Sequence, residues 1–285
     1  MATVIVPAHN EASVIRRCLD SLIQQPQLTT LIVACNGCTD DTATIVRKEY
    51  PQAICLDIAT PSKVNALNEA EKHATCFPIF YIDADTQLSA GAIQTITQAL
   101  AADPKTLLAA PEPVIDTSQS SWWVKQYYRT WLQLPYIRDG VVATCSYVIT
   151  QQGRERFATF PTVINDDGFV RCQFHRHERR NIPDAQIFIT APRDLASLIK
   201  IKTRARLGNM QLAATRLCTC TESKPYSSIL RNKLFSKAVF STLIYTVIAL
   251  IIRLRATYQY QHLQTYVWEK DQTSRTQHPP QKGAR

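Results

Sequence analysis

A short apolar run that ends in two carboxylates constrains this sequence more than any other stretch. Residues 79–82, Ile-Phe-Tyr-Ile, combine β-branched and aromatic side chains, as a strand buried on both faces of a parallel sheet does. Asp83 and Asp85 follow directly, at the carboxyl end of the strand, where open α/β sheets bind ligands. One neutral residue between them leaves both free to face a divalent cation, which takes its other oxygens from water and a substrate phosphate. A polar turn is the alternative, because turns favour Asp.

Strand and helix patterns alternate along the chain. We expect strands at 3–8, 30–34, 53–57, 79–82, 106–110 and 140–149, and helices at 11–25, 42–50, 62–73, 89–102 and 122–134. This alternation predicts an α/β fold with a doubly wound, mostly parallel sheet and right-handed crossovers. A second acidic pair, Asp166 and Asp167, lies far from the first in sequence.

Cysteine usage and charge indicate compartment and partner. Nine cysteines at irregular spacing, with no signal peptide ahead of them, predict reduced thiols in a cytosolic compartment. Residues 171–285 carry 20 of the 32 Lys and Arg but only 6 of the 23 Asp and Glu, so this half favours an anionic partner. Nucleic-acid binders usually add interleaved aromatics or a recognisable module, and neither is present here. An anionic membrane is therefore expected, and no nucleic acid.

Residues 238–252 form an apolar run without charge, Gly or Pro. As a helix these residues cover roughly 22 Å, short of the roughly 30 Å hydrocarbon core of a bilayer. A short span, a membrane-embedded hairpin element, an in-plane anchor and a buried core helix all fit this run. We expect a catalytic domain over 1–225, a membrane-associating helical segment over 226–270 and a disordered tail over 271–285.

Five segments, in order along the chain, resemble a family 2 glycosyltransferase of the GT-A fold. They are Val-Ile-Val-Pro-Ala-His-Asn-Glu (4–11), Asn-Gly-Cys-Thr-Asp (36–40), Lys-Val-Asn-Ala-Leu-Asn (63–68), Asp-Ala-Asp (83–85) and Asp-Asp (166–167). The resemblance runs from residue 4 to about 208. It implies an inverting enzyme that uses a nucleotide-diphosphate sugar, UDP-linked by family expectation, and Mn²⁺ or Mg²⁺.

The resemblance also implies roles for individual residues. The nucleotide-binding residues it implies are Pro7, His9, Asn10, Glu11, Asn36, Lys63, Asp83 and Arg204. Lys63 and Arg204 are expected near the diphosphate and Asp83 near the ribose, while Asp85 would hold the metal. Asp167 is expected to be the general base that takes the proton of the acceptor hydroxyl, with Asp166 beside it to tune it.

Two departures from the family pattern narrow the expected base recognition and the expected type of sugar transfer. Cys35 and Asn36 stand where many relatives have two acids, so an amide would meet the nucleotide base. Of the Gln-x-x-Arg-Trp segment that holds the polymer in processive relatives, only Arg204 remains, because Ile201 and Ala205 occupy the Gln and Trp positions. This departure favours transfer of a single sugar over polymer synthesis. With the family resemblance and the expected membrane association, we expect a hexose, a lipid-linked or glycan acceptor at the cytoplasmic face of the membrane, and a role in cell-envelope polysaccharide or glycolipid synthesis.

Other motifs have competing interpretations. The Cys-x-x-Cys spacing of Cys35 and Cys38 is a weak redox or zinc signal, because Cys218 and Cys220 have the wrong spacing for a second pair. A metal role for Cys172, His175 and His177 is less favoured than a solvated or acceptor-facing surface. The aromatic positions Trp122, Trp123, Tyr127, Tyr128 and Trp131 fall at helical spacing and favour core over sugar stacking.

Two other functions compete with the glycosyltransferase. A sugar nucleotidyltransferase shares the nucleotide-binding α/β fold, but it needs a Gly-rich phosphate loop after the first strand, and residues 6–11 contain no glycine. A non-catalytic, membrane-associated sugar-binding or scaffold protein could keep the fold and lose the chemistry. The joint presence of Asp83, Asp85 and Asp167 counts against it.

Overall fold

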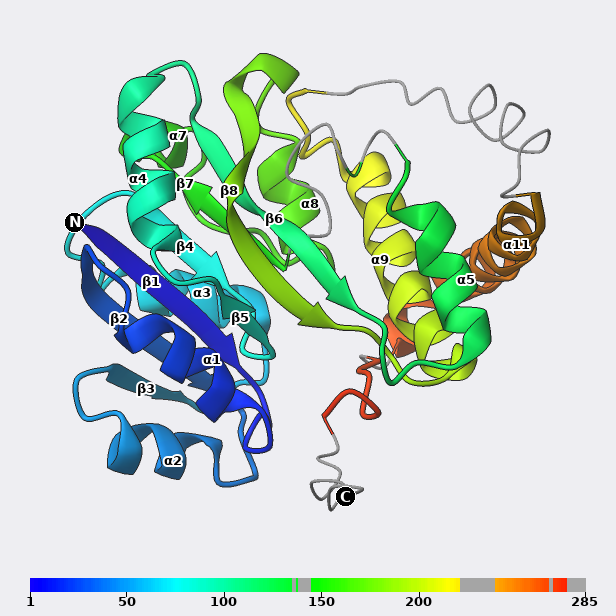
Figure 1. Cartoon of the computed structure of the whole chain (residues 1–285), viewed down its shortest axis with the longest axis horizontal. Helices are drawn as coiled ribbons and strands as arrows, with labels where there is room; N and C mark the ends of the chain where they lie inside the picture. Colours follow the sequence, from blue (N-terminus) through cyan, green and yellow to red (C-terminus); the bar gives the residue numbers. More distant parts are fainter. Residues whose placement is uncertain (135–136, 138–144, 221–238, 267–268, 276–285) are drawn as a thin grey trace, which may run out of the picture.

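The computed structural model of the chain describes residues 1–134, 137, 145–220, 239–266 and 269–275 (Figure 1). It contains an eight-stranded sheet in the order β3-β2-β1-β4-β7-β6-β8-β5. Its strands are β1 (Ala2–Ala8), β2 (Leu28–Asn36), β3 (Ile54–Ile58), β4 (Ile79–Ile82), β5 (Thr86–Leu88), β6 (Leu108–Asp116), β7 (Ser146–Ile149) and β8 (Arg179–Thr190). The α/β prediction is confirmed.

One half of the sheet is parallel throughout, as predicted. Strands β3, β2, β1 and β4 run parallel, and β6 pairs in parallel with β8, whereas β7 is antiparallel to both β4 and β6, and β5 is antiparallel to β8. The sheet is therefore mixed, with four of the seven pairings between the described strands parallel, and the antiparallel strands of its second half were not predicted. Hydrophobic patterns show that a strand is buried but not in which direction it runs, so this difference could not be read from the residues.

Helices cover both faces of the parallel half. They are α1 (Ile15–Ile23), α2 (Thr42–Glu49), α3 (Lys63–Glu71) and α4 (Ala92–Ala102). Alternate residues of β1 explain the two layers, because side chains of a strand point to opposite faces. Val4 and Val6 pack in one core with residues of α1, α2 and α4, whereas Ile5 packs in a second core with residues of α3.

Strand β6 continues further than the predicted strand at 106–110. Pro111 and Pro113 lie inside it, although proline cannot donate to a strand ladder. The pairing of β6 with β8 shifts register between Pro111 and Glu112, and the strand then continues to Asp116. The bulge lies between the two prolines and lets the strand continue past them.

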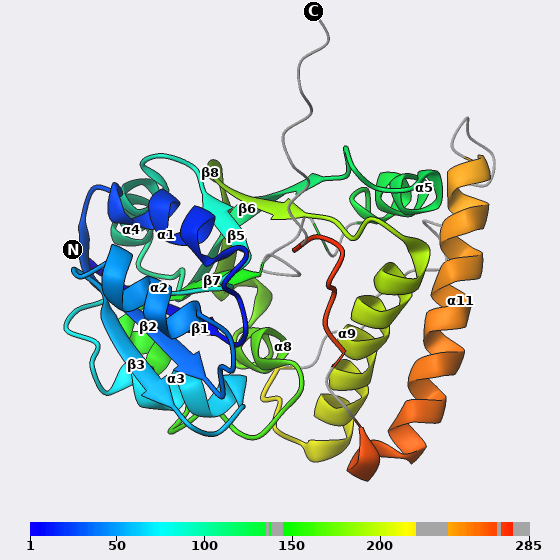
Figure 2. The ribbon, with the colours of Figure 1, turned by 90° about the horizontal axis from the view of Figure 1, so that it is seen from below.

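The remaining helices are α5 (Trp122–Trp131), α7 (Gln151–Arg154), α8 (Asp166–Arg171), α9 (Leu195–Thr215) and α11 (Val239–Gln261), with 3₁₀ turns η1 (Arg176–Glu178) and η2 (Leu263–Thr265). Phe169 and Val170 of α8 pack in the second core, and a third core lies beside the sheet. Helices α5, α9 and α11 pack together through buried apolar residues of all three (Figure 2). No strand or helix had been expected between residues 171 and 238, so β8 and α9 were not predicted.

Helix α11 has one buried and one exposed apolar face. Ile244, Ile248 and Ile252 are buried against α5 and α9. The exposed face is formed by Phe240, Leu243, Val247, Leu250, Ile251, Leu254 and Tyr258. The helix has the length and composition of a membrane span, but a third of its most apolar stretch is buried inside the protein.

Residues 271–275 had been predicted to start a disordered tail, and here the prediction is wrong. Asp271 is buried, and its carboxylate accepts hydrogen bonds from the backbone N–H groups of Thr273 and Ser274. The N–H of Arg193 donates to Thr273 Oγ1 at 2.9 Å. These contacts hold a polar segment in place that lacks a hydrophobic signal of its own. Residues 276–285, the rest of the predicted tail, lie outside the described residues, as do 226–238 and 267–268 of the predicted membrane segment and 140–144 of the predicted sixth strand.

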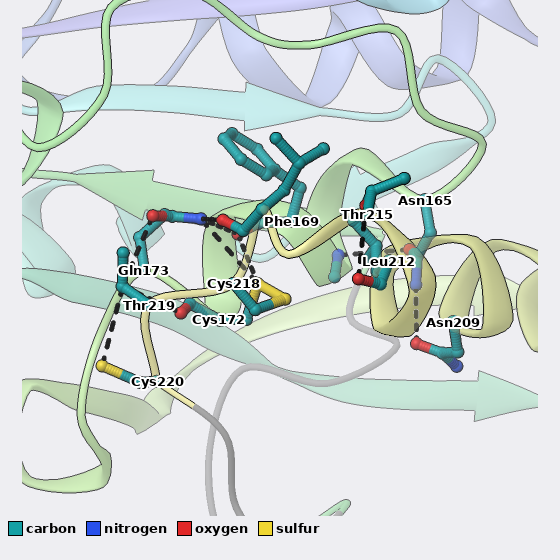
Figure 3. Close-up of a disulfide and its surroundings, with 12 residues drawn as sticks. Asn165, Phe169, Cys172, Gln173, Asn209, Leu212, Thr215, Cys218, Thr219 and Cys220 are labelled. Carbon is teal, nitrogen blue, oxygen red and sulfur yellow. Dashed lines mark hydrogen bonds between the residues drawn. A yellow bond between two sulfur atoms is a disulfide. The ribbon is translucent and has the colours of Figure 1, made fainter.

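The prediction that all cysteines are reduced thiols is wrong for two of them. Cys172, which ends α8, forms a disulfide with Cys218, which follows α9 (Figure 3). The other seven cysteines are free. The sequence separation of 46 between the two partners gives no spacing signal, and only the packing of α8 against α9 brings them together. The disulfide also removes Cys172 from the metal site considered with His175 and His177.

Candidate active site

The loops after β1 and β2 meet at the carboxyl edge of the sheet and are tied together by polar side chains. His9 Nδ1 donates to the carbonyl of Asn36 at 2.6 Å, and Asn36 Nδ2 donates to the carbonyl of Ala8 at 2.9 Å. Asn10 has a positive φ of 52°, and its Oδ1 accepts from the N–H of Thr39 at 2.7 Å. Pro7 pairs with Ala34 in the adjacent strand. The structure thus brings together four of the predicted nucleotide-binding residues.

Lys63 joins the two acidic motifs. It opens α3, whose first turn is capped by Ser62, and its Nζ lies 2.8 Å from Asp83 Oδ1 and 3.1 Å from Asp166 Oδ1. Burial opposes the charge of Lys63, but the carboxylates of Asp166 and Asp83 outweigh it and hold the pKa of Lys63 above its ordinary value. Two carboxylates that are 83 positions apart in sequence therefore share one cation.

The members of the second acidic pair have different surroundings. Asp166 is buried, contacts Lys63 and accepts a hydrogen bond from the hydroxyl of Tyr147 at 3.4 Å. Asp167 is partly exposed in the first turn of α8, and its Oδ1 accepts from the N–H of Gly168 at 2.7 Å. Burial and then the charge of Asp166 raise the pKa of Asp167 to about 6, although Lys63 opposes the shift. A carboxylate with a pKa near neutrality is suited to accept and release a proton.

Close packing holds α8 in place. Asn165 caps the helix, with its Oδ1 accepting from the N–H of Gly168 at 3.1 Å, and its Nδ2 donates to Asn209 Oδ1 on α9 at 3.0 Å. A Cβ on Gly208 would lie 2.5 Å from the Cβ of Asn165, so α9 can approach this closely only with glycine at that position. The carboxylates of α8 are thereby fixed against α9.

Two cations that were not predicted from the sequence lie against Glu11, and one of them also contacts Asp85. Arg275 Nη2 is 2.6 Å from Asp85 Oδ2, and Arg275 Nε is 2.9 Å from Glu11 Oε2. Lys270 Nζ is 2.7 Å from Glu11 Oε1. Both cations stand alone in a polar stretch, so no spacing or periodicity could have pointed to them.

Arg204 lies beside the same C-terminal segment. Its Nη1 donates to the carbonyl of Glu269 at 2.8 Å, one residue before Lys270. The carboxylate of Glu269 in turn pairs with Arg255 of α11. The structure thus places Arg204 against residues that precede Lys270, and its expected approach to a diphosphate stays a prediction.

Comparison with known proteins decides the family. The sequence profile described as Glycosyl transferase family 2 matches residues 3–154, more than half of the chain. The chain belongs to glycosyltransferase family 2. The match includes the loops after β1, β2 and β4 together with Lys63, so these parts of the site lie in the family's own region.

Solved structures similar to this glycosyltransferase show the GT-A fold. A mannosyltransferase from Pyrobaculum calidifontis, in complex with GDP-Man and Mn²⁺, has a TM-score of 0.59 at 21% identity and covers 92% of this chain and 79% of its own. Glucosyl-3-phosphoglycerate synthase from Mycobacterium tuberculosis, with Mn²⁺ and UDP, has a TM-score of 0.53 at 16% identity over 78% of this chain and 81% of its own. At these identities the likeness concerns the fold alone.

Curated relatives match over shorter stretches. An uncharacterized glycosyltransferase of Escherichia coli K12, YaiP, is 33% identical over 86 residues, which are 29% of this chain and 22% of the relative. Chondroitin synthase of Pasteurella multocida is 29% identical over 98 residues, 33% of this chain and 10% of that protein. This glycosyltransferase therefore matches only about a fifth or less of the length of these relatives.

The donor set of the site fits a divalent cation. Within the described residues, no group of three or more His, Cys, Asp and Glu side chains could hold a metal ion by itself. Asp85 offers a hard carboxylate oxygen at the sheet edge, and the guanidinium of Arg275 lies against that oxygen. A divalent metal that is held by one protein carboxylate takes its remaining ligands from water and a bound diphosphate. The single carboxylate of Asp85 suits a metal of this kind.

The predictions for two other motifs have different outcomes. Tyr127, Tyr128 and Trp131 are buried, as the core interpretation requires, but Trp122 and Trp123 are 46% and 50% exposed. The Cys35 thiol interacts with the thiols of both Cys38, its partner in the Cys-x-x-Cys spacing, and Cys55, whose sulfur lies 4.0 Å away. Among the described residues these thiols do not form a group that could hold a metal ion.

Proposed function

We propose that this glycosyltransferase moves a single sugar, with inversion, from a nucleotide-diphosphate sugar to a lipid-linked or glycan acceptor at the cytoplasmic face of a membrane. The contact of Lys63 with Asp83 and Asp166 is the observation that carries the proposal. Asp83 belongs to the loop expected to hold the donor, and Asp166 adjoins the expected base. A base within reach of the donor's sugar carbon is what a direct displacement needs.

The side chains divide the work of such a reaction. Asp167 accepts the proton of the attacking hydroxyl, since its raised pKa still leaves it mostly ionised at neutral pH. Lys63 keeps Asp83 and Asp166 from repelling an approaching diphosphate, because it neutralises part of their charge. A divalent ion held by Asp85, Mn²⁺ or Mg²⁺, would stabilise the negative charge that develops on the leaving diphosphate. Attack by one nucleophile from the side opposite the leaving group inverts the anomeric carbon.

The donor is proposed from the loops after β1 and β2. The amide of Asn36 is buried and bonded to Ala8, so it shapes the pocket for the nucleotide base through the backbone of its loop. Solved structures of similar fold were obtained with GDP-Man, UDP and UDP-GlcNAc, which supports a nucleotide sugar as donor. We expect the donor to carry a uridine nucleotide, as the family resemblance implies.

Membrane association is proposed through the exposed face of α11. Trp122 of α5 lies 5.6 Å from Phe240 of α11 between ring centroids, so the exposed tryptophans extend that apolar face. The opposite face of α11 is buried against α5 and α9, which favours a helix that lies in the plane of the membrane surface over one surrounded by lipid. The excess of basic residues in 171–285 would add attraction to anionic lipids.

Thermal unfolding of the purified full chain with nucleotides tests the proposal. UDP, GDP and CDP, and the corresponding triphosphates, are each added with and without Mn²⁺. A ligand present at 100 times its Kd stabilises the folded state by about 2.7 kcal/mol, so one diphosphate with Mn²⁺ is expected to raise Tm by several degrees. Stabilisation by nucleoside triphosphates but by no diphosphate would instead support the nucleotidyltransferase, and no stabilisation by any nucleotide would contradict a donor site.

A further inference from the structure

The segment that follows α11 returns to the donor site. It runs alongside α9 (Figure 2), where Arg204 donates to the carbonyl of Glu269. Lys270 Nζ donates to the carbonyls of His9 at 2.7 Å and Asn10 at 2.9 Å, in addition to its contact with Glu11. Residues 269–275, which we name the C-terminal strap, therefore lie on the loop after β1.

The strap is a built part of the site. The side chains of Lys270 and Arg275 are only 16% and 12% exposed, and Arg275 also donates to the carbonyl of Asp271 at 2.5 Å. Asp271 folds the turn that presents Arg275, because it accepts bonds from Thr273 and Ser274. Ion pairs that are this shielded from water are stronger than pairs on the surface.

Arg275 occupies the position where the site needs a cation. Its guanidinium bridges Glu11, from the loop after β1, and Asp85, from the loop after β4. Lys270 contacts Glu11 and not Asp85, so it cannot replace Arg275 beside the Asp85 carboxylate. A divalent ion that binds Asp85 must therefore compete with Arg275 for the same carboxylate.

We propose that Arg275 competes with a divalent ion for Asp85 and turns onto the donor diphosphate when the ion binds there. This inference rests on the proposed function, in which Asp85 holds the metal. Glu11 and Lys270 keep the strap against the loop after β1, so the guanidinium needs only to turn from one anion to the next. A planar guanidinium binds phosphate oxygens as well as it binds carboxylates.

The proposed exchange of Arg275 for a divalent ion on Asp85 predicts two opposite effects of one substitution, Arg275→Gln in the full chain. Binding of Mn²⁺ alone, followed by the paramagnetic resonance of the free ion, is expected to tighten about tenfold, because a competing unit charge is gone. Binding of the nucleoside diphosphate that stabilises the wild type, measured by calorimetry at saturating Mn²⁺, is expected to weaken about tenfold, because a charge-assisted hydrogen bond is lost.

Two further variants serve as comparisons. Arg16→Gln removes an exposed arginine that pairs with Glu49 at 2.6 Å on the outside of α1, and both dissociation constants are expected to stay unchanged. Arg275→Lys keeps the charge but not the planar fork, so its two effects are expected to have the same signs and smaller sizes. It supplies the same test if Arg275→Gln fails to fold.

The outcomes separate the exchange from the proposed function. Unchanged or weaker Mn²⁺ binding by Arg275→Gln overturns the competition, and unchanged nucleotide binding overturns the transfer of Arg275 to the diphosphate. A wild-type chain that binds Mn²⁺ but no nucleotide would overturn the proposed function itself, whatever the variant does.

Discussion

Asp167 and Asp166 are adjacent in sequence and have different partners. Asp166 shares Lys63 with Asp83 and is buried, whereas Asp167 is partly exposed and accepts a hydrogen bond from the N–H of its neighbour Gly168. The first is suited to hold the site together and the second to exchange a proton. This division follows from the geometry of α8, whose first turn points successive side chains in different directions.

The clearest test at the scale of the residue is Asp167→Asn. The amide keeps size and polarity but cannot accept the proton, so the rate of transfer is expected to fall about a hundredfold or more, with the donor Kd nearly unchanged. Asp166→Asn is the matched comparison. It is expected to slow transfer less and to weaken donor binding more, because it disturbs Lys63. The rates and dissociation constants of both variants check this, and a near-normal rate for Asp167→Asn would move the base elsewhere.

The pH dependence of the wild type belongs to the same prediction. A general base works in its ionised form, and the pKa of Asp167 is raised to about 6. Transfer is therefore expected to be constant above that pH and to fall about tenfold for each pH unit below it. Asp167→Asn should lack this fall.

At this scale the motifs predict much of the site but not all of it. Lys63, Asp83 and Asp166 could be named from the sequence, and the structure brings them into contact. Lys270 and Arg275 could not be named, because single cations in a polar stretch carry no pattern. Their position depends on how the chain returns after α11, which is a property of the whole fold.

Among the elements, α11 is the one whose sequence allowed the most interpretations. Its apolar residues surround the helix, so composition could not separate a span from a core helix. The structure buries Ile248 and leaves its neighbour Val247 exposed. Each face can therefore be tested independently of the other.

Substitutions on the two faces of α11 are expected to act on different properties. Val247→Gln with Leu254→Gln should leave unfolding unchanged but weaken binding to anionic vesicles, by about tenfold for each side chain that enters the lipid. Ile248→Ala should instead lower the free energy of unfolding by about 2–5 kcal/mol, because it leaves a cavity between α11 and α9. Vesicle sedimentation and thermal unfolding measure these effects. Unaltered vesicle binding by the double variant would argue against the in-plane anchor.

Elements in the second half of the sheet were harder to predict than those in the first. The first half repeats strand, loop and helix, and its motifs fall at the ends of β1, β2 and β4. Strand β8 has an alternating burial pattern interrupted by Pro183 and Asp184, and its partner β6 contains two prolines. Such strands depend on pairing with each other, which local propensity does not reveal.

Segments from the whole molecule meet at the carboxyl edge of the parallel strands. The parallel half supplies the loops expected to hold the nucleotide, α8 supplies the second acidic pair, and the C-terminal strap reaches the same edge from α11 (Figure 1). Residues from the start and the end of the chain thus meet at Glu11. The family could be predicted from ordered motifs, whereas this closure of the chain on itself could not.

The release of nucleoside diphosphate from a panel of nucleotide sugars, with and without Mn²⁺, tests the central claim most directly. We expect the full chain to hydrolyse one donor slowly when no acceptor is present, only with a divalent ion, and to release the sugar first as the inverted anomer, which proton NMR detects. Asp85→Ala should lose this activity and keep its fold. Release that is independent of metal, a retained anomeric configuration, or no turnover of any donor even with membrane lipid as acceptor would contradict an inverting, metal-assisted transfer at this site.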